Sequence, residues 1–117
     1  MDLRRRLGNS GEDRAAAFLK KRGYRIIERN WRDALGEIDL IAADRDTLVF
    51  VEVRTRVSGM QATPEDSVTL TKQRKLARLA EAYTARQRYQ GDWRIDVVAI
   101  DDSGIRHLVS AVEEQGD

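Results

Sequence analysis

The sequence has 117 residues, with no cysteine, one histidine and one proline. Without cysteine, the chain cannot form a thiolate zinc site, a disulfide framework or a cysteine nucleophile. With His107 as the only imidazole, it does not support a histidine-rich zinc site, and any Ser-His-Asp triad would depend on that one residue. The chemistry that remains uses oxygen ligands, which suit hard divalent cations such as Mg²⁺ or Mn²⁺.

Long hydrophobic runs are also absent. No stretch approaches the roughly 20 apolar residues that cross a bilayer, and the charged segment Met1–Gly8 is not followed by the apolar stretch of a secretory signal. The apolar content of 41% and the charged content of 35% are typical of a soluble globular protein. We therefore expect one cytoplasmic domain over residues 1–117 without a membrane partner, flexible at residues 1–8 and 113–117.

Hydrophobic periodicity predicts two helices and five strands. Ser10, with Asp13 three residues later, resembles a capping box, and Gly23 is typical of a helix end. The expected elements are, in order, a helix from about Ser10 to Gly23, strands over 24–31, 37–43 and 47–56, a long amphipathic helix over about 69–88, and strands over 93–100 and 105–112. This order indicates an α/β fold with a mixed central sheet flanked by helices.

Three carboxylates stand where polar groups are costly. Asp39 and Glu52 interrupt apolar strands, and Glu12 shares the apolar face of the first helix. Buried carboxylates are unfavourable unless they are paired or bind a metal, and like charges crowded together need a cation. The sequence therefore predicts that Glu12, Asp39 and Glu52 hold a divalent ion. Glu37 is the rival for the place of Glu12, because it lies roughly 7 Å from Asp39 on the same strand face; we expect it to support the ligands.

Two other interpretations of these acids stay open. Asp39 and Glu52 can belong to a structural ion-pair network with Arg54, Arg56 or Arg94. The helix glutamate can simply favour the positive end of the helix dipole.

Basic charge is concentrated just after the carboxylates. Between Val53 and Arg88 there are eight Lys or Arg residues against three Asp or Glu. This distribution suits an anionic polymer held beside a metal, and it predicts that Arg56, Lys72 and Lys75 contact phosphate while Gln73 supports the site. The alternative is an ordinary solvated helix face.

The motifs resemble a known group of nucleases. A helix glutamate, an aspartate on the second strand and Glu52-Val53-Arg54 on the third resemble the PD-(D/E)xK pattern. The chain is more closely similar to the uncharacterised bacterial YraN family, which is related to archaeal Holliday junction resolvases. The segments that carry this similarity are Gly11-Glu12, Gly36-Glu37-Ile38-Asp39-Leu40-Ile41, Phe50-Val51-Glu52-Val53-Arg54-Thr55-Arg56, Lys72-Gln73-Arg74 and Asp96-Val97-Val98. The resemblance implies a restriction-endonuclease-like αβββαββ core and an Mg²⁺-dependent or Mn²⁺-dependent endonuclease that acts on structured or branched DNA, with Glu12, Asp39, Glu52 and Arg54 as catalytic residues.

Arg54 departs from the usual motif, in which a lysine stands at this position. A lysine can take a proton from the attacking water, whereas an arginine stays charged and cannot act as a base. Arg54 can still hold the scissile phosphate and offset its charge. A second hypothesis is therefore a non-catalytic module that binds nucleic acid, or an adaptor, on a nuclease-like fold. A two-fold homodimer would suit a symmetric junction.

Overall fold

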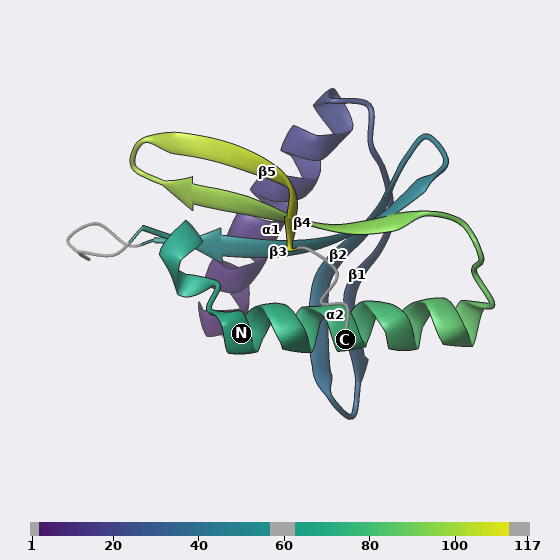
Figure 1. Cartoon of the computed structure of the whole chain (residues 1–117). Helices are drawn as coiled ribbons and strands as arrows, with labels where there is room; N and C mark the ends of the chain where they lie inside the picture. Colours follow the sequence, from purple (N-terminus) through teal and green to yellow (C-terminus); the bar gives the residue numbers. More distant parts are fainter. Residues whose placement is uncertain (1–2, 57–62, 113–117) are drawn as a thin grey trace.

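The computed structural model describes residues 3–56 and 63–112, with side chains from residue 10 onward in the first helix (Figure 1). In chain order its elements are α1 (Leu3–Lys21), β1 (Arg25–Asp33), β2 (Gly36–Asp44), β3 (Thr47–Thr55), the 3-10 helix η1 (Glu65–Ser67), α2 (Leu70–Gln87), β4 (Trp93–Asp101) and β5 (Gly104–Val112). This order confirms the predicted αβββαββ arrangement. Among the described residues, no helix is long and apolar enough to cross a membrane.

The strands form one mixed sheet in the order β1-β2-β3-β4-β5. Neighbouring strands are antiparallel except β3 and β4, which are parallel. The chain passes from β3 to β4 through α2, which supplies the crossover that parallel strands require. Helix α2 covers one face of the sheet and α1 covers the other (Figure 1). This architecture confirms the predicted fold class, a restriction-endonuclease-like core.

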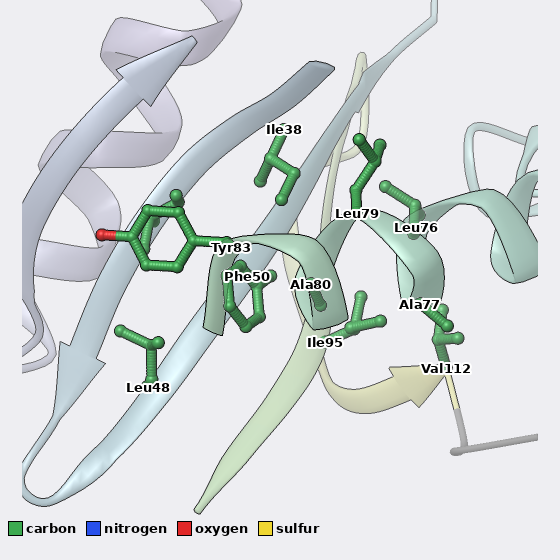
Figure 2. Packing of buried hydrophobic residues seen from close by; sticks show 11 residues of the cluster. Ile38, Leu48, Phe50, Leu76, Ala77, Leu79, Ala80, Tyr83, Ile95 and Val112 are labelled. Carbon is green, nitrogen blue, oxygen red and sulfur yellow. The ribbon is translucent and has the colours of Figure 1, made fainter. Parts of the chain in front are cut away.

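The sheet divides the hydrophobic core into two clusters. Figure 2 shows the cluster under α2, where Phe50 of β3 packs edge-on against Tyr83 of α2 with 5.6 Å between ring centroids. The cluster under α1 contains Leu19, Val49 and Val98, none of which has exposed surface. Burial of each such side chain contributes about 1.5–3 kcal/mol. Both helices are therefore packed firmly against the sheet. This packing also fixes the positions of the polar side chains on the helices.

Helix α2 has caps at both ends. The Thr69 hydroxyl accepts a hydrogen bond from the backbone N–H of Lys72 at 3.3 Å, which satisfies one of the free donors of the first turn. Arg88 adopts a left-handed conformation with φ of 53° and ends the helix. These bounds agree with the helix predicted over about 69–88.

The start of α1 differs from the prediction. The helix begins at Leu3, so Ser10 lies inside it and does not cap it. Gly11 is buried, and a Cβ atom at this position would lie 2.8 Å from Cγ2 of Thr55. The glycine therefore allows α1 to approach β3 closely, which is the physical reason for its place in the helix. Residues 3–8, expected at a flexible end, form the first turns of α1, and the expected flexible tail at 113–117 lies outside the described residues.

The pairing between β2 and β3 ends next to Asp39. Registered pairs between these strands begin at Leu40, opposite Val51, and continue toward the turn. Strict alternation along β2 would put Ile38 and Leu40 on one face. The structure separates them instead: Ile38 belongs to the cluster under α2, and Leu40 to the cluster under α1. On β1, Asn30 lies opposite Asp39 and has φ of 56°. The irregular backbone at this point explains why simple periodicity failed.

Candidate functional site

Asp39 lies at the point where β2 leaves β3. Its Oδ2 atom accepts a hydrogen bond from the backbone N–H of Val53 at 2.8 Å, so a side chain takes the place of a strand partner. A pocket of about 340 Å³ opens beside it, between β2, β3 and the first half of α2. The pocket is lined by Glu37, Asp39, Glu52, Val53, Arg54, Lys72, Lys75, Leu76 and Leu79.

Carboxylate oxygens from two elements converge at this edge of the sheet. One oxygen from each of Glu12, Glu37 and Asp39 lies within 4.8 Å of the others. Glu12 reaches the group from α1, because Gly11 lets the helix approach β3. Three negative groups at such separations repel one another, so the arrangement is favourable only when some of them are protonated or share a cation.

The arginines of β1 neutralise the outer acids only in part. The Arg32 Nε atom lies 3.0 Å from Glu37. The Arg29 guanidinium lies 3.7 Å from Glu12 Oε2 but contacts Asp13 at 2.6 Å. Among the described residues, the buried Oε2 atom of Glu12 has no hydrogen-bond partner. In the described part of the chain, one carboxylate oxygen of the acid cluster is therefore buried without a hydrogen-bond donor.

Among the acids of the site, Asp39 has the most strongly raised pKa. Burial raises the pKa of this carboxyl to about 7, the negative charge of Glu52 adds to the shift, and the Val53 N–H opposes it. The pKa of Glu12 is also raised, first by burial and then by the charges of Asp39 and Glu37, while Asn30 and Arg29 lower it. In the part of the chain that the structure describes, no Lys or Arg lies within ion-pair distance of Asp39.

Glu52 joins the site from the neighbouring strand. It is buried on the α2 face of β3 and lines the pocket, and its negative charge helps to raise the pKa of Asp39. Sequence reasoning grouped it with Glu12 and Asp39 and gave Glu37 a supporting place. In the structure Glu37 lies in the tight oxygen group, and Glu52 adjoins that group through Asp39. The four carboxylates together offer the oxygen-only ligand set that Mg²⁺ and Mn²⁺ prefer.

Arg54 is held in one position above Glu52. Its Nη1 atom lies 3.7 Å from Glu52 Oε1, and its Nε atom donates to the Ser67 hydroxyl at 2.7 Å. Ser67 belongs to η1, so the loop before α2 orients the guanidinium. The sequence contained no signal for Ser67, because it meets Arg54 only after the crossover folds. Asn30 was also missed, although an asparagine inside a strand already indicates an irregular backbone.

The predicted phosphate contacts separate into two groups. Lys72 and Lys75 line the pocket with the acids. Gln73 donates from Nε2 to the Val68 carbonyl at 3.0 Å, so it fixes the start of α2. Arg56 does not line the pocket; its backbone N–H donates to the Ile100 carbonyl at the far end of β3. The structure therefore brings two of these four residues to the acids.

Comparison with known proteins assigns the chain to a family. The model of "Uncharacterised protein family UPF0102" matches residues 11–100, which include all four carboxylates. A UPF0102 protein of Caldicellulosiruptor saccharolyticus is 50% identical over 98 residues, 83% of each chain. One of Symbiobacterium thermophilum is 57% identical over 84 residues, 72% of this chain and 71% of the relative. One of Roseiflexus castenholzii is 44% identical over 95% of this chain and 96% of the relative. The chain thus belongs to the uncharacterised protein family UPF0102.

Proposed function

We propose that this protein is a metal-dependent endonuclease that hydrolyses phosphodiester bonds in structured or branched DNA. The observation that carries the proposal is the convergence of Glu12, Glu37 and Asp39, in which the half-buried Asp39 has no cationic partner among the described residues. Lysines line the same pocket, so one cavity combines ligands for a cation with contacts for a phosphate.

Glu12, Glu37 and Asp39, with Glu52 beside them, are the residues that would hold Mg²⁺ or Mn²⁺. The residues fit such an ion, because all their donor atoms are oxygens and one of them, Glu12 Oε2, is buried without a hydrogen bond from any described residue. When bound, the ion supplies Lewis-acid stabilisation of the charge that builds up on the phosphate.

The remaining residues of the pocket have separate tasks. Lys72 and Lys75 bind the non-bridging oxygens of the phosphate. Arg54, fixed by Ser67, stabilises negative charge on the phosphate but cannot take a proton. Water attacks phosphorus, the bond to the leaving oxygen breaks, the water proton passes to a carboxylate, and the leaving oxygen takes a proton from solvent. We assign that acceptor role to Glu52, which lines the pocket 3.7 Å from Arg54.

A specific observation also favours a second candidate, a non-catalytic module that binds nucleic acid. Arg54 stands where nucleases of similar motif carry lysine, and it is engaged with both Glu52 and Ser67. If Glu52 does not accept the proton, the pocket binds phosphate without hydrolysing it. Both candidate functions predict that the protein binds nucleic acid, but only the nuclease predicts that it cleaves it.

Cleavage assays separate the two candidates. We would incubate labelled single-stranded, duplex, flap and four-way-junction DNA with Mg²⁺ or Mn²⁺. Wild-type protein and Asp46→Asn, a matched change at an exposed turn acid, should cleave, whereas Asp39→Asn and Glu12→Gln should not. DNA that is bound but stays intact would replace the nuclease with the binding module. Cleavage that persists in EDTA or in Asp39→Asn would refute the metal site.

A further inference from the structure

A second cleft lies on the outer side of α2, next to the carboxylate pocket. It has a volume of about 340 Å³ and is lined by Leu35, Thr71, Arg74, Lys75 and Arg78. Lys75 lines both cavities, so the cleft continues from the pocket along the helix. Neither Arg74 nor Arg78 lines the carboxylate pocket, and the proposed chemistry leaves both without a role.

The charge of this cleft is of one sign. It contains three cations and no acid. Some arginines elsewhere are matched, as in the pairs of Arg86 with Asp33 and Arg106 with Glu65. Within residues 3–56 and 63–112 the three cations of the cleft form no ion pair. Arg74 and Arg78 stand one helical turn apart, a spacing at which like charges repel by about 0.2–0.5 kcal/mol. The uncompensated charge is therefore complementary to a polyanion.

Lys75 is positioned by the turn between β1 and β2. Gly36 has φ of 149°, and a Cβ atom there would lie 2.7 Å from Cε of Lys75. The missing side chain thus leaves room for the lysine stem to cross the turn backbone. This contact holds the ammonium group of Lys75 between the two cavities.

Leu35 presents an apolar side chain at the rim of the same cleft. It is 49% exposed, and its backbone N–H donates to Asp33 Oδ1 at 2.7 Å. Such a turn, closed by an aspartate side chain, has a defined conformation. Arg86 lies 3.8 Å from the other oxygen of Asp33 and ties the turn to α2. An exposed leucine beside cations resembles the apolar contacts that proteins make with sugars and bases next to bound phosphates.

We propose that this cleft binds a DNA nucleotide that flanks the scissile phosphate. The phosphate lies among Arg74, Lys75 and Arg78, and the sugar or base packs on Leu35. The inference rests on the proposed function, because it assigns the path of the substrate away from the carboxylate pocket. In this proposal, contacts from α2 determine which phosphate of the DNA strand lies at the carboxylates.

Salt-dependent binding tests the cationic part. Affinity for a fluorescein-labelled four-way DNA junction and for a linear duplex is measured by anisotropy in Ca²⁺ over a series of KCl concentrations. Arg74→Gln/Arg78→Gln should weaken binding on the order of 10-fold and make the slope of log K against log[KCl] shallower by about 2, because two phosphate contacts are lost. The matched double change Lys20→Gln/Lys21→Gln, at exposed positions of α1, should alter neither quantity.

Leu35→Ala tests the apolar part separately. Loss of the leucine contact should weaken binding by about fivefold and leave the salt slope unchanged, because no phosphate contact is removed. Unchanged affinity in Leu35→Ala would remove the leucine from the interface. If Arg74→Gln/Arg78→Gln keeps the wild-type affinity and salt slope, the cleft is not a DNA site. The same conclusion follows if the wild-type protein binds polyglutamate through these arginines but does not bind DNA.

Hydrolysis of bis(p-nitrophenyl) phosphate with Mn²⁺ tests the proposed function without using the cleft. This small diester should be cleaved equally by wild-type protein and the control Lys20→Gln/Lys21→Gln, and not by Asp39→Asn. No hydrolysis by wild-type protein, with DNA binding that still depends on Arg74 and Arg78, would refute the nuclease and keep the cleft. Hydrolysis together with unaltered DNA binding in Arg74→Gln/Arg78→Gln would refute the cleft and keep the nuclease.

Discussion

Two aspartates of the same sheet, the buried Asp96 and the half-buried Asp39, have opposite surroundings. Asp96 of β4 has no exposed surface, yet it is fully matched. Arg94 donates to it from Nε at 3.0 Å, His107 Nε2 lies at 2.8 Å, and the backbone N–H of Ser110 donates at 2.9 Å. Asp39 instead faces other carboxylates and, among the described residues, accepts a hydrogen bond from one backbone N–H. Both carboxylates are removed from solvent, Asp96 fully and Asp39 in part, so the missing cation is what distinguishes a candidate site from a structural network.

We expect the largest loss of stability when Asp96, the aspartate with hydrogen-bond partners, is replaced. Asp96→Ala should lower the free energy of unfolding by about 3–5 kcal/mol, because the buried His107 side chain would lose its acceptor and the half-buried Arg94 would keep only Asp44 as a carboxylate partner. Urea denaturation of the variant checks this. Asp102→Ala, at an exposed turn, should change stability by less than about 0.5 kcal/mol. A cost near that of Asp102→Ala would mean that Asp96 is not the centre of the network.

Metal should stabilise the unmatched aspartate. An ion that binds only the folded state at 100 times its dissociation constant adds about 2.7 kcal/mol to stability. Mn²⁺ should therefore raise the thermal unfolding midpoint of wild-type protein and of Asp46→Asn, and leave that of Asp39→Asn unchanged. An equal shift in Asp39→Asn would place the bound Mn²⁺ elsewhere.

The pH dependence of stability in EDTA sharpens the comparison. The pKa of Asp39 is raised from 3.8 to about 7 in the folded state. The group therefore contributes stability in its protonated form, fully present below its unfolded pKa and lost as pH rises through about 7. Above that pH, Asp39→Asn should be more stable than wild-type protein by on the order of 1–2 kcal/mol, since the amide keeps an acceptor for the Val53 N–H without the charge. Urea denaturation across the pH range measures the difference; parallel curves would contradict the raised pKa.

The smallest effect concerns how Glu12 reaches Asp39. Gly11→Ala should push α1 from β3, because the new methyl group would meet Thr55 Cγ2 at 2.8 Å. We expect a net cost of about 1 kcal/mol, since overpacking outweighs the better helix propensity of alanine. Mn²⁺ affinity, measured by calorimetry, should fall several-fold. Adding Thr55→Ser removes the clashing methyl and should restore it; no rescue would mean that helix approach does not position Glu12.

The order of elements could be predicted from the sequence, because each element carries its own local signal. The Thr69 cap marks the start of α2, and the apolar strands with polar turns mark the sheet. Asp39 and Glu52 stood out for the same reason, since each interrupts an apolar strand. Local sequence patterns were therefore enough to identify Asp39 and Glu52, because their place in the site follows from their positions in the strands.

The rest of the site depends on packing between distant segments. Glu37 enters the oxygen group at the point where β2 leaves β3, a geometry that a period of two does not describe. Ser67 orients Arg54 across the crossover. The start of α1 was missed because Ser10 and Gly11 resemble a helix beginning, whereas Gly11 serves a close contact with β3.

The most direct test of the unmatched acid cluster is an anomalous difference map from crystals soaked in Mn²⁺. We expect a peak among the carboxylates of Glu12, Glu37 and Asp39, which is lost in Asp39→Asn. We expect no peak at Asp96, because Arg94 and His107 already occupy the positions around its carboxylate. A map without density at the cluster, or with the same peak in Asp39→Asn, would contradict the claim that these acids form a metal centre.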